Sequence, residues 1–230
     1  APPLDGGDFA GFDPAQSTVH RSLLLGPTVD VETVSLTNAV GTADDLNGSD
    51  DEDALVFPTV TAGQPVTLPV TVSNTSGAPA YLNAWIDYNN NGVLTDPGEQ
   101  IANQITVPTG VTGSVIPLNF QIPTDAVTAA TTLGSRFRLT DIPNPGPTGS
   151  TGIGEVEDHG VVILAPSTDF GDFSGAPNVS NTATTNLRLG NLVDAEYAAT
   201  TNALATGDDS TGVDDEDGVT FSSMIAFQQA

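Results

Sequence analysis

The chain has 230 residues, which is enough for one large or two ordinary domains, and 38% of them are hydrophobic. It carries 29 acidic residues against four arginines and no lysine, so its formal net charge is −25 and it repels nucleic acid and anionic membrane surfaces. The absence of cysteine excludes disulfides, thiolate metal sites and cysteine nucleophiles, and no apolar run approaches the roughly 20 residues of a membrane span.

Residues 1–54 predict an acidic, loop-rich leading segment. Gly, Pro and Asp are frequent up to residue 25, and the segment ends in a run of four carboxylates, Asp50-Asp-Glu-Asp53. Packed carboxylates repel one another, and a divalent cation removes that repulsion, whereas a solvated acidic loop needs no metal. The candidate calcium ligands of this run are Asp50, Asp51 and Asp53.

The leading segment is repeated later in the chain. Residues 26–57 align without a gap on residues 190–221, with 16 identical residues in 32 positions. The pair Asp8-Phe9 also resembles Asp169-Phe170, at an offset of 161 residues. We therefore expect residues 166–230 to be a second leading segment that begins a next repeat or links to a neighbouring subunit. Its matching candidate ligands are Asp214, Asp215 and Asp217.

Residues 55–165 predict a β-sandwich. Apolar and polar residues alternate over residues 66–72, 81–88 and 116–122, and Gly- and Pro-containing turns separate these runs. Six or seven short strands in about 110 residues are typical of an immunoglobulin-like fold. The expected fold class is all-β, an immunoglobulin-like antiparallel β-sandwich with loop-rich acidic flanking segments.

Within the sandwich, residues 87–99 predict a calcium loop. Oxygen-bearing side chains occupy positions 1, 3 and 5, and Gly92 occupies position 6, where the chain must turn sharply. The closing glutamate stands at position 13, one later than in an EF-hand, and a strand precedes the loop instead of a helix. The alternative is an Asn-Gly turn that joins two strands without a metal. The candidate ligands are Asp87, Asn89, Asn91, Val93 (through its carbonyl), Asp96 and Glu99.

Four motifs in this order resemble the GEVED domain, a β-sandwich module of large secreted and surface proteins of bacteria. They are Tyr81-Leu-Asn-Ala-Trp-Ile-Asp-Tyr-Asn-Asn-Asn-Gly92, Asp96-Pro-Gly-Glu99, Arg136-Phe-Arg-Leu139 and Gly154-Glu-Val-Glu-Asp158. The resemblance implies a multidomain surface protein, often of the adhesin type.

Three acids of the last motif have two interpretations. Glu155, Glu157 and Asp158 contribute to a calcium site, form ion pairs with Arg136 or Arg138, or do both, because one carboxylate can bridge an arginine and a metal. Trp85, the only tryptophan, lies in the first motif and serves either the core or, as a ligand-binding residue, a sugar.

We expect a non-enzymatic, calcium-stabilised structural module of an extracellular repeat protein, adhesin or fibre, secreted or at the cell surface. Neither histidine is accompanied by a nucleophile motif. The expected cofactor is Ca²⁺, and the expected partners are neighbouring copies of the module, in tandem or head to tail, and a surface glycan or protein. Nucleic-acid binding and membrane insertion are not expected. Two alternatives stay open, a carbohydrate-binding module and an acidic, salt-adapted surface-layer type protein without a specific metal.

Overall fold

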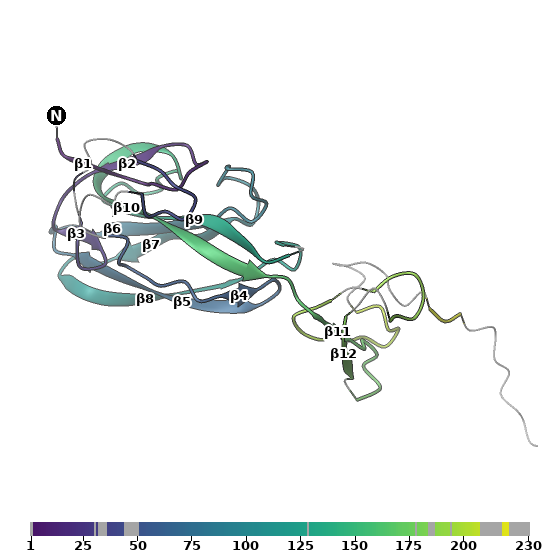
Figure 1. The fold of residues 1–230 in the computed structure, drawn as a ribbon. Coiled ribbons are helices and arrows are strands. Elements are labelled where there is room, and N and C mark those ends of the chain that lie inside the picture. Colours follow the sequence, from purple (N-terminus) through teal and green to yellow (C-terminus); the bar gives the residue numbers. More distant parts are fainter. Residues whose placement is uncertain are drawn as a thin grey trace, which may run out of the picture. The chain divides into compact units, whose positions relative to one another are not determined.

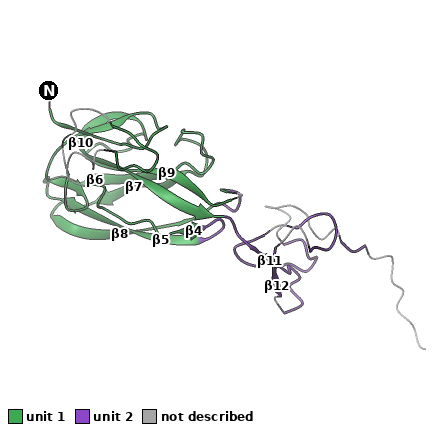
Figure 2. Ribbon diagram, viewed as in Figure 1, with its two compact units in different colours: residues 1–60, 65–122, 126–164 green, residues 61–64, 123–125, 165–230 purple. Residues whose placement is uncertain are grey.

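The structure is a computed structural model. It describes residues 2–29, 31, 36–43, 51–127, 129–177, 179–183, 187–193, 195–207 and 218–220. Figure 2 shows two compact units, the first formed by residues 1–60, 65–122 and 126–164, and the second by residues 61–64, 123–125 and 165–230. The first unit thus contains the leading segment together with the β-sandwich region.

Strands are the only regular secondary structure of the described residues, so the expected all-β class is confirmed. No described residue lies in a helix long and apolar enough to cross a membrane. The strands are β1 (Leu4–Gly6), β2 (Ala15–Thr18), β3 (Leu23–Leu25), β4 (Val60–Thr61), β5 (Pro65–Asn74), β6 (Ala80–Ile86), β7 (Gln100–Val107), β8 (Val111–Gln121), β9 (Thr131–Thr140), β10 (Gly149–Leu164), β11 (Thr168–Phe170) and β12 (Ser180–Thr182).

Unit 1 consists of two sheets that face each other (Figure 1). One sheet has the strand order β1-β2-β10-β9-β6-β7, with β4 paired to β10, and the other has the order β3-β5-β8. Period-2 patterning explains the layers, because every second residue of β5 is apolar and turns toward the core. The buried residues of β5, β6 and β9 include Val66, Leu68, Val70, Val72, Leu82, Ala84, Ile86, Leu133, Phe137 and Leu139.

One strand pair departs from the antiparallel arrangement expected from the sequence. β2 runs parallel to the first residues of β10, with Gly149 opposite Ala15 and Ile153 opposite Thr18. β9 pairs antiparallel with the rest of β10, from Gly154 onward. The expectation of a wholly antiparallel sandwich is therefore wrong at this pair, because β2 comes from the leading segment and reaches β10 through a nonlocal connection.

The leading segment is an integral part of unit 1. Its strand β3 pairs antiparallel with β5, with Leu24 opposite Ser73. Leu23 and Leu25 on either side are 0% exposed. Phe9 and Ala15 are also buried, and the N–H of Gly26 donates to a β5 carbonyl. Burying apolar side chains of this size contributes roughly 1.5–3 kcal/mol each, so the segment contributes substantially to the core.

Unit 2 repeats the local fold of the leading segment with an offset of 164 residues. β11 and β12 pair antiparallel with Asp169 opposite Asn181, as β1 and β2 pair with Asp5 opposite Ser17. The parallel bridge of Phe9 to Asn38 has its counterpart in Phe173 and Asn202, as the sequence offset requires.

The offset of 161 residues for Asp8-Phe9 is therefore wrong. Asp172 is the structural equivalent of Asp8. The N–H of Ala43 donates to Asp8 Oδ2, and the N–H of Gly207 donates to Asp172 Oδ2, both at 2.6 Å. The two Asp-Phe pairs of the second copy, at residues 169 and 172, make the sequence ambiguous, and the hydrogen bonds resolve which one is equivalent.

Candidate functional site

Residues 87–99, called the Asp87 loop, connect β6 to β7 and close on themselves. The N–H of Ile86, the last residue of β6, donates to the carbonyl of Glu99 at 2.9 Å, so the two ends of the loop lie side by side. The Asp87 carboxylate accepts the N–H of Asn91 at 3.1 Å and the N–H of Gly92 at 2.8 Å. Positions 1, 5 and 6 of the expected loop are thus brought together around one carboxylate.

The other side chains of the loop converge on Asp96. The Nδ2 atoms of Asn89 and Asn91 both donate to Asp96 Oδ2, at 2.6 and 2.8 Å. Their Oδ1 atoms accept the N–H groups of Asn91 and Val93. Val93 joins the network through its N–H, and its side chain is exposed. All six candidate residues of this loop therefore lie in one hydrogen-bonded unit.

Glu99 is the residue of the loop with a buried carboxylate oxygen that accepts no hydrogen bond. Asp87 and Glu99 are each 2% exposed, and Glu99 Oε1 has no hydrogen-bond partner. Burial raises the pKa of Glu99, and the Asp87 carboxylate raises that pKa further. Among the described residues, neither carboxylate forms an ion pair with an arginine or a histidine. A cation beside Glu99 would offset this repulsion and give the unpartnered oxygen a ligand role.

Backbone conformation fixes the loop against the leading segment. Gly92 has a φ of 80° and Asn90 a φ of 55°, both in the left-handed region that favours Gly and Asn. A Cβ atom on Gly92 would lie 2.6 Å from the carbonyl oxygen of Gly11. The glycine at position 6 is therefore needed both for the turn and for close contact with the leading segment.

The acids of β10, namely Glu155, Glu157 and Asp158, form the second part of the site, and all three are at most 1% exposed. The ion-pair alternative is confirmed for Asp158. Its Oδ1 lies 2.7 Å from Arg136 Nε and its Oδ2 lies 2.8 Å from Arg136 Nη2. Arg136 is itself buried, so this is a desolvated bidentate pair of the strong type.

Arg138 serves a different purpose. Its guanidinium donates to backbone carbonyls and to one hydroxyl, and burial, then the Arg136 charge, lowers its pKa to about 10. Its acceptors are the carbonyls of Gln16, Gly146, Thr148 and Gly149, and Thr151 Oγ1. Arg138 thereby ties β2 of the leading segment to β10.

Each β10 acid accepts a backbone N–H from the leading segment, a set of contacts that no local sequence pattern predicts. Phe9 donates to Asp158 Oδ2 at 2.9 Å, Leu25 to Glu155 Oε2 at 2.6 Å, and Ala54 to Glu157 Oε1 at 3.2 Å. In return, the N–H of Val156 donates to Asp5 Oδ2 at 2.6 Å. The internal repeat was the only sequence signal that pairs a leading segment with a sandwich. The Gly-Glu-Val-Glu-Asp motif is therefore a docking strand for the leading segment.

The acidic run of the leading segment lies near these acids. Burial, together with the charges of Asp5, Glu157 and Asp51, raises the pKa of Glu155 to about 12. The pKa of Glu157 is also raised, mainly by burial and in part by Asp53, while its hydrogen bond to a histidine opposes the shift. Glu155 Oε1 has no hydrogen-bond partner. Such crowding requires either a bound proton or a cation. The remaining candidates, Asp50, Asp214, Asp215 and Asp217, lie outside the described residues.

A preassembled cage of acidic ligands is not seen. In the part of the chain that the structure describes, no three Asp, Glu or His side chains converge closely enough to hold a metal ion. The Asp87 loop instead offers two buried carboxylates, Asp87 and Glu99, together with Asp96, amide oxygens and backbone carbonyls. Oxygen ligands of this mixed kind fit calcium, whose coordination is flexible, and the unpartnered Glu99 Oε1 fits a ligand position.

The aromatic residues near the loop belong to the core. Trp85 is 3% exposed and Tyr88 is 7% exposed, so the core alternative for Trp85 agrees with the structure. The Tyr88 hydroxyl has no hydrogen-bond partner, and burial followed by the Glu99 charge raises its pKa.

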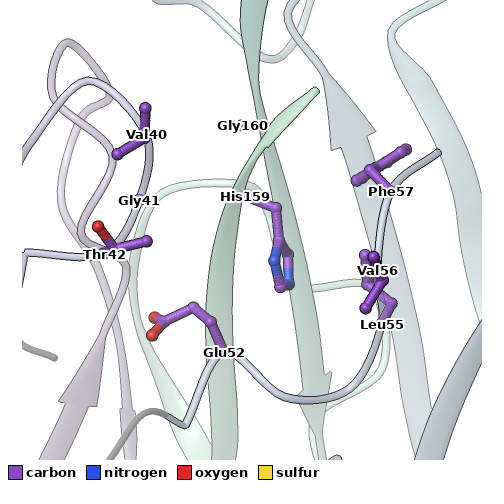
Figure 3. A pocket seen from close by; sticks show the side chains of 9 residues that line it. All are labelled: Val40, Gly41, Thr42, Glu52, Leu55, Val56, Phe57, His159 and Gly160. Carbon is purple, nitrogen blue, oxygen red and sulfur yellow. The ribbon is translucent and has the colours of Figure 1, made fainter. Parts of the chain in front are cut away.

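A pocket of about 300 Å³ lies where the leading segment and residues 55–57 meet His159 and Gly160 of β10 (Figure 3). The His159 ring stands in its middle, with Glu52 on one side and Val56 on the other. His159 Nε2 lies 3.0 Å from Glu157 Oε2. The leading segment supplies Val40, Gly41, Thr42 and Glu52 of its lining, and residues 55–57 with His159 and Gly160 supply the rest, so the pocket depends on the docked leading segment.

Residues 81–162 match the GEVED domain family, so the resemblance is confirmed over this range. The matched range begins in β6 and ends in β10, and it contains the Asp87 loop and the β10 acids. A comparison with curated proteins found no match.

Proposed function

We propose that this chain, whose residues 81–162 form a GEVED domain, is a calcium-stabilised structural module of an extracellular repeat protein of the adhesin or fibre type, with modules joined head to tail. GEVED domains are modules of surface and secreted proteins, which supports an extracellular location. The repeated leading segment supports a series of modules. An immunoglobulin-like assignment of the two sheets is part of this proposal and rests on their short, alternating strands.

The observation that carries the calcium proposal is the pair of buried carboxylates, Asp87 and Glu99, in the Asp87 loop. Glu99 Oε1 is buried without a donor, and Asp87 lies close enough to raise the pKa of Glu99. An Asn-Gly turn needs neither buried carboxylate, whereas calcium needs six to eight oxygens. The ion neutralises both acids and fixes the loop against Gly11 of the leading segment.

The expected stabilisation is large compared with the stability of one domain. Extracellular modules bind calcium with a Kd of ~10⁻⁴ to 10⁻³ M. At a calcium concentration about 100 times the Kd, one site contributes about 2.7 kcal/mol. A domain of this type has a free energy of unfolding of roughly 5–15 kcal/mol, so calcium removal lowers it substantially.

Thermal unfolding at fixed ionic strength, with calcium and with chelator, tests the proposal. Wild type and an exposed-site control, Asp13→Ala, should melt at a higher temperature with calcium, and Asp87→Ala should lose most of that rise. Glu99→Gln is the sharper variant, because it removes the repulsion without changing the shape of the side chain. It should match or exceed the wild-type melting temperature in chelator and fall below it in calcium.

A melting temperature that follows ionic strength and ignores calcium would instead favour the salt-adapted alternative. For the carbohydrate-binding alternative, Trp85 and Tyr88 are buried and present no open ring face for a sugar, whereas Tyr81 is half-buried.

A further inference from the structure

The two leading segments have the same local fold but different surroundings. Leu23 and Leu25 of the first are 0% exposed, whereas their equivalents Leu187 and Leu189 are 84% and 75% exposed. Phe173 is likewise exposed, although its equivalent, Phe9, is buried. The second segment thus carries an apolar surface that the first one buries on the sandwich.

The main-chain hydrogen bonds show that the second segment is already shaped for the same role. The N–H of Asn38 donates to the carbonyl of Asp8 at 2.9 Å, and that of Asn202 donates to the carbonyl of Asp172 at 2.8 Å. The hairpins agree residue by residue as well. The exposure of Leu187 and Leu189 is therefore not a consequence of a different local fold.

The second segment also keeps the groups that β10 recognises. Asp169 stands at the position of Asp5, the acceptor for the N–H of Val156. Phe173 and Leu189 stand at the positions whose N–H groups donate to Asp158 and Glu155. In this chain those acids already accept N–H groups of the first leading segment, so they do not serve the second one.

We propose that the second leading segment docks onto a second GEVED-type sandwich that presents Glu, Glu and Asp at the positions of Glu155, Glu157 and Asp158. Leu187 and Leu189 then fill the site that Leu23 and Leu25 fill here, and the pair forms the joint between consecutive modules. This inference rests on the head-to-tail arrangement proposed above. It adds the partner surface and the residues that join the modules.

An extended chain tests the docking. A copy of residues 58–165 is appended after residue 221, the equivalent of residue 57, so that the second leading segment precedes a sandwich. The natural chain has no cysteine, so a single Leu187→Cys substitution reports the accessibility of that position through its rate of thiol labelling. In the 230-residue chain Leu187→Cys should label rapidly. In the extended chain it should label at least about 100-fold more slowly, because labelling then requires local opening.

Leu204→Cys is the matched control. Leu204 is 82% exposed, and its equivalent Val40 stays 50% exposed when the first leading segment is docked, so this cysteine should label rapidly in both chains. A second control replaces residues 166–221 of the extended chain by residues 2–57, with the cysteine at the copied Leu23. That chain shows whether the appended sandwich folds with a leading segment known to fit.

The docking proposal would be overturned by two results together. The second control labels slowly, which shows that the appended sandwich folds, and Leu187→Cys labels equally fast in the 230-residue chain and in the extended chain. Calcium-dependent melting of the 230-residue chain would be untouched by that result, so the calcium proposal and the docking proposal fail independently.

Discussion

Substituting Asp158→Asn tests whether the buried ion pair between Asp158 of β10 and Arg136 of β9 holds the leading segment on the sandwich. The carboxylate makes two bonds to the Arg136 guanidinium, at 2.7 and 2.8 Å, and accepts the N–H of Phe9 at 2.9 Å. Asn is nearly the same size, but it removes the charge and presents an amide N–H₂ where Arg136 also presents donors.

The expected loss follows from the burial of both partners. Asp158 is 0% exposed and Arg136 is 1% exposed, so the variant leaves a guanidinium charge without compensation in the interior. Breaking a buried pair in this way costs about 3–5 kcal/mol, compared with about 0.2–1 kcal/mol for an exposed pair. A loss of this size removes a large share of the stability of a small domain.

Urea unfolding followed by tryptophan fluorescence measures the effect, because Trp85 is the only tryptophan and is buried in unit 1. Asp13→Asn is the matched control. Its side chain is exposed, and only its backbone carbonyl contacts Arg136, so we expect a change within about 0.5 kcal/mol. A loss below about 1 kcal/mol for Asp158→Asn would refute the view that this pair secures the leading segment.

Three further predictions concern proton binding, backbone geometry and the second arginine. Because the folded-state pKa of Glu155 is raised to about 12 from 4.5, the folded chain keeps a proton that the unfolded chain loses, and stability in chelator should fall as pH rises from about 5 to 8. Glu155→Gln should reduce this fall by up to about 1.4 kcal/mol per pH unit in urea titrations, and an unchanged slope would contradict the assignment. Gly92→Ala should lower the melting temperature more than Gly77→Ala, since both glycines have positive φ but only Gly92 lies against the Gly11 carbonyl. Equal losses would show that this contact does not contribute to stability. Arg138→Lys should cost about 2 kcal/mol or more in urea unfolding, because a lysine cannot reach several carbonyls at once, and a neutral result would show that these bonds are dispensable.

The sequence by itself determined the features that depend on neighbouring residues. Alternation of apolar and polar residues predicted strands, and the spacing of Asp87, Asn89 and Asn91 around Gly92 predicted a sharply turned loop, whose side-chain oxygens accept backbone N–H groups of the loop. Both patterns act over a few residues, where backbone geometry alone decides which side chains meet. The repeat predicted that residues 26–57 and 190–221 are equivalent, because comparing the two sequence segments requires no knowledge of the tertiary structure.

Tertiary structure alone decided which acids are buried and what they bind. Asp158 receives the N–H of Phe9 across 149 positions of sequence, and no local pattern specifies such a partner. The parallel pairing of β2 with β10 is equally nonlocal. The sequence also left open whether Asp158 binds a metal or an arginine, because a carboxylate suits both. The choice depends on burial, since removing Arg136 and Asp158 from water is tolerable only when each satisfies the other.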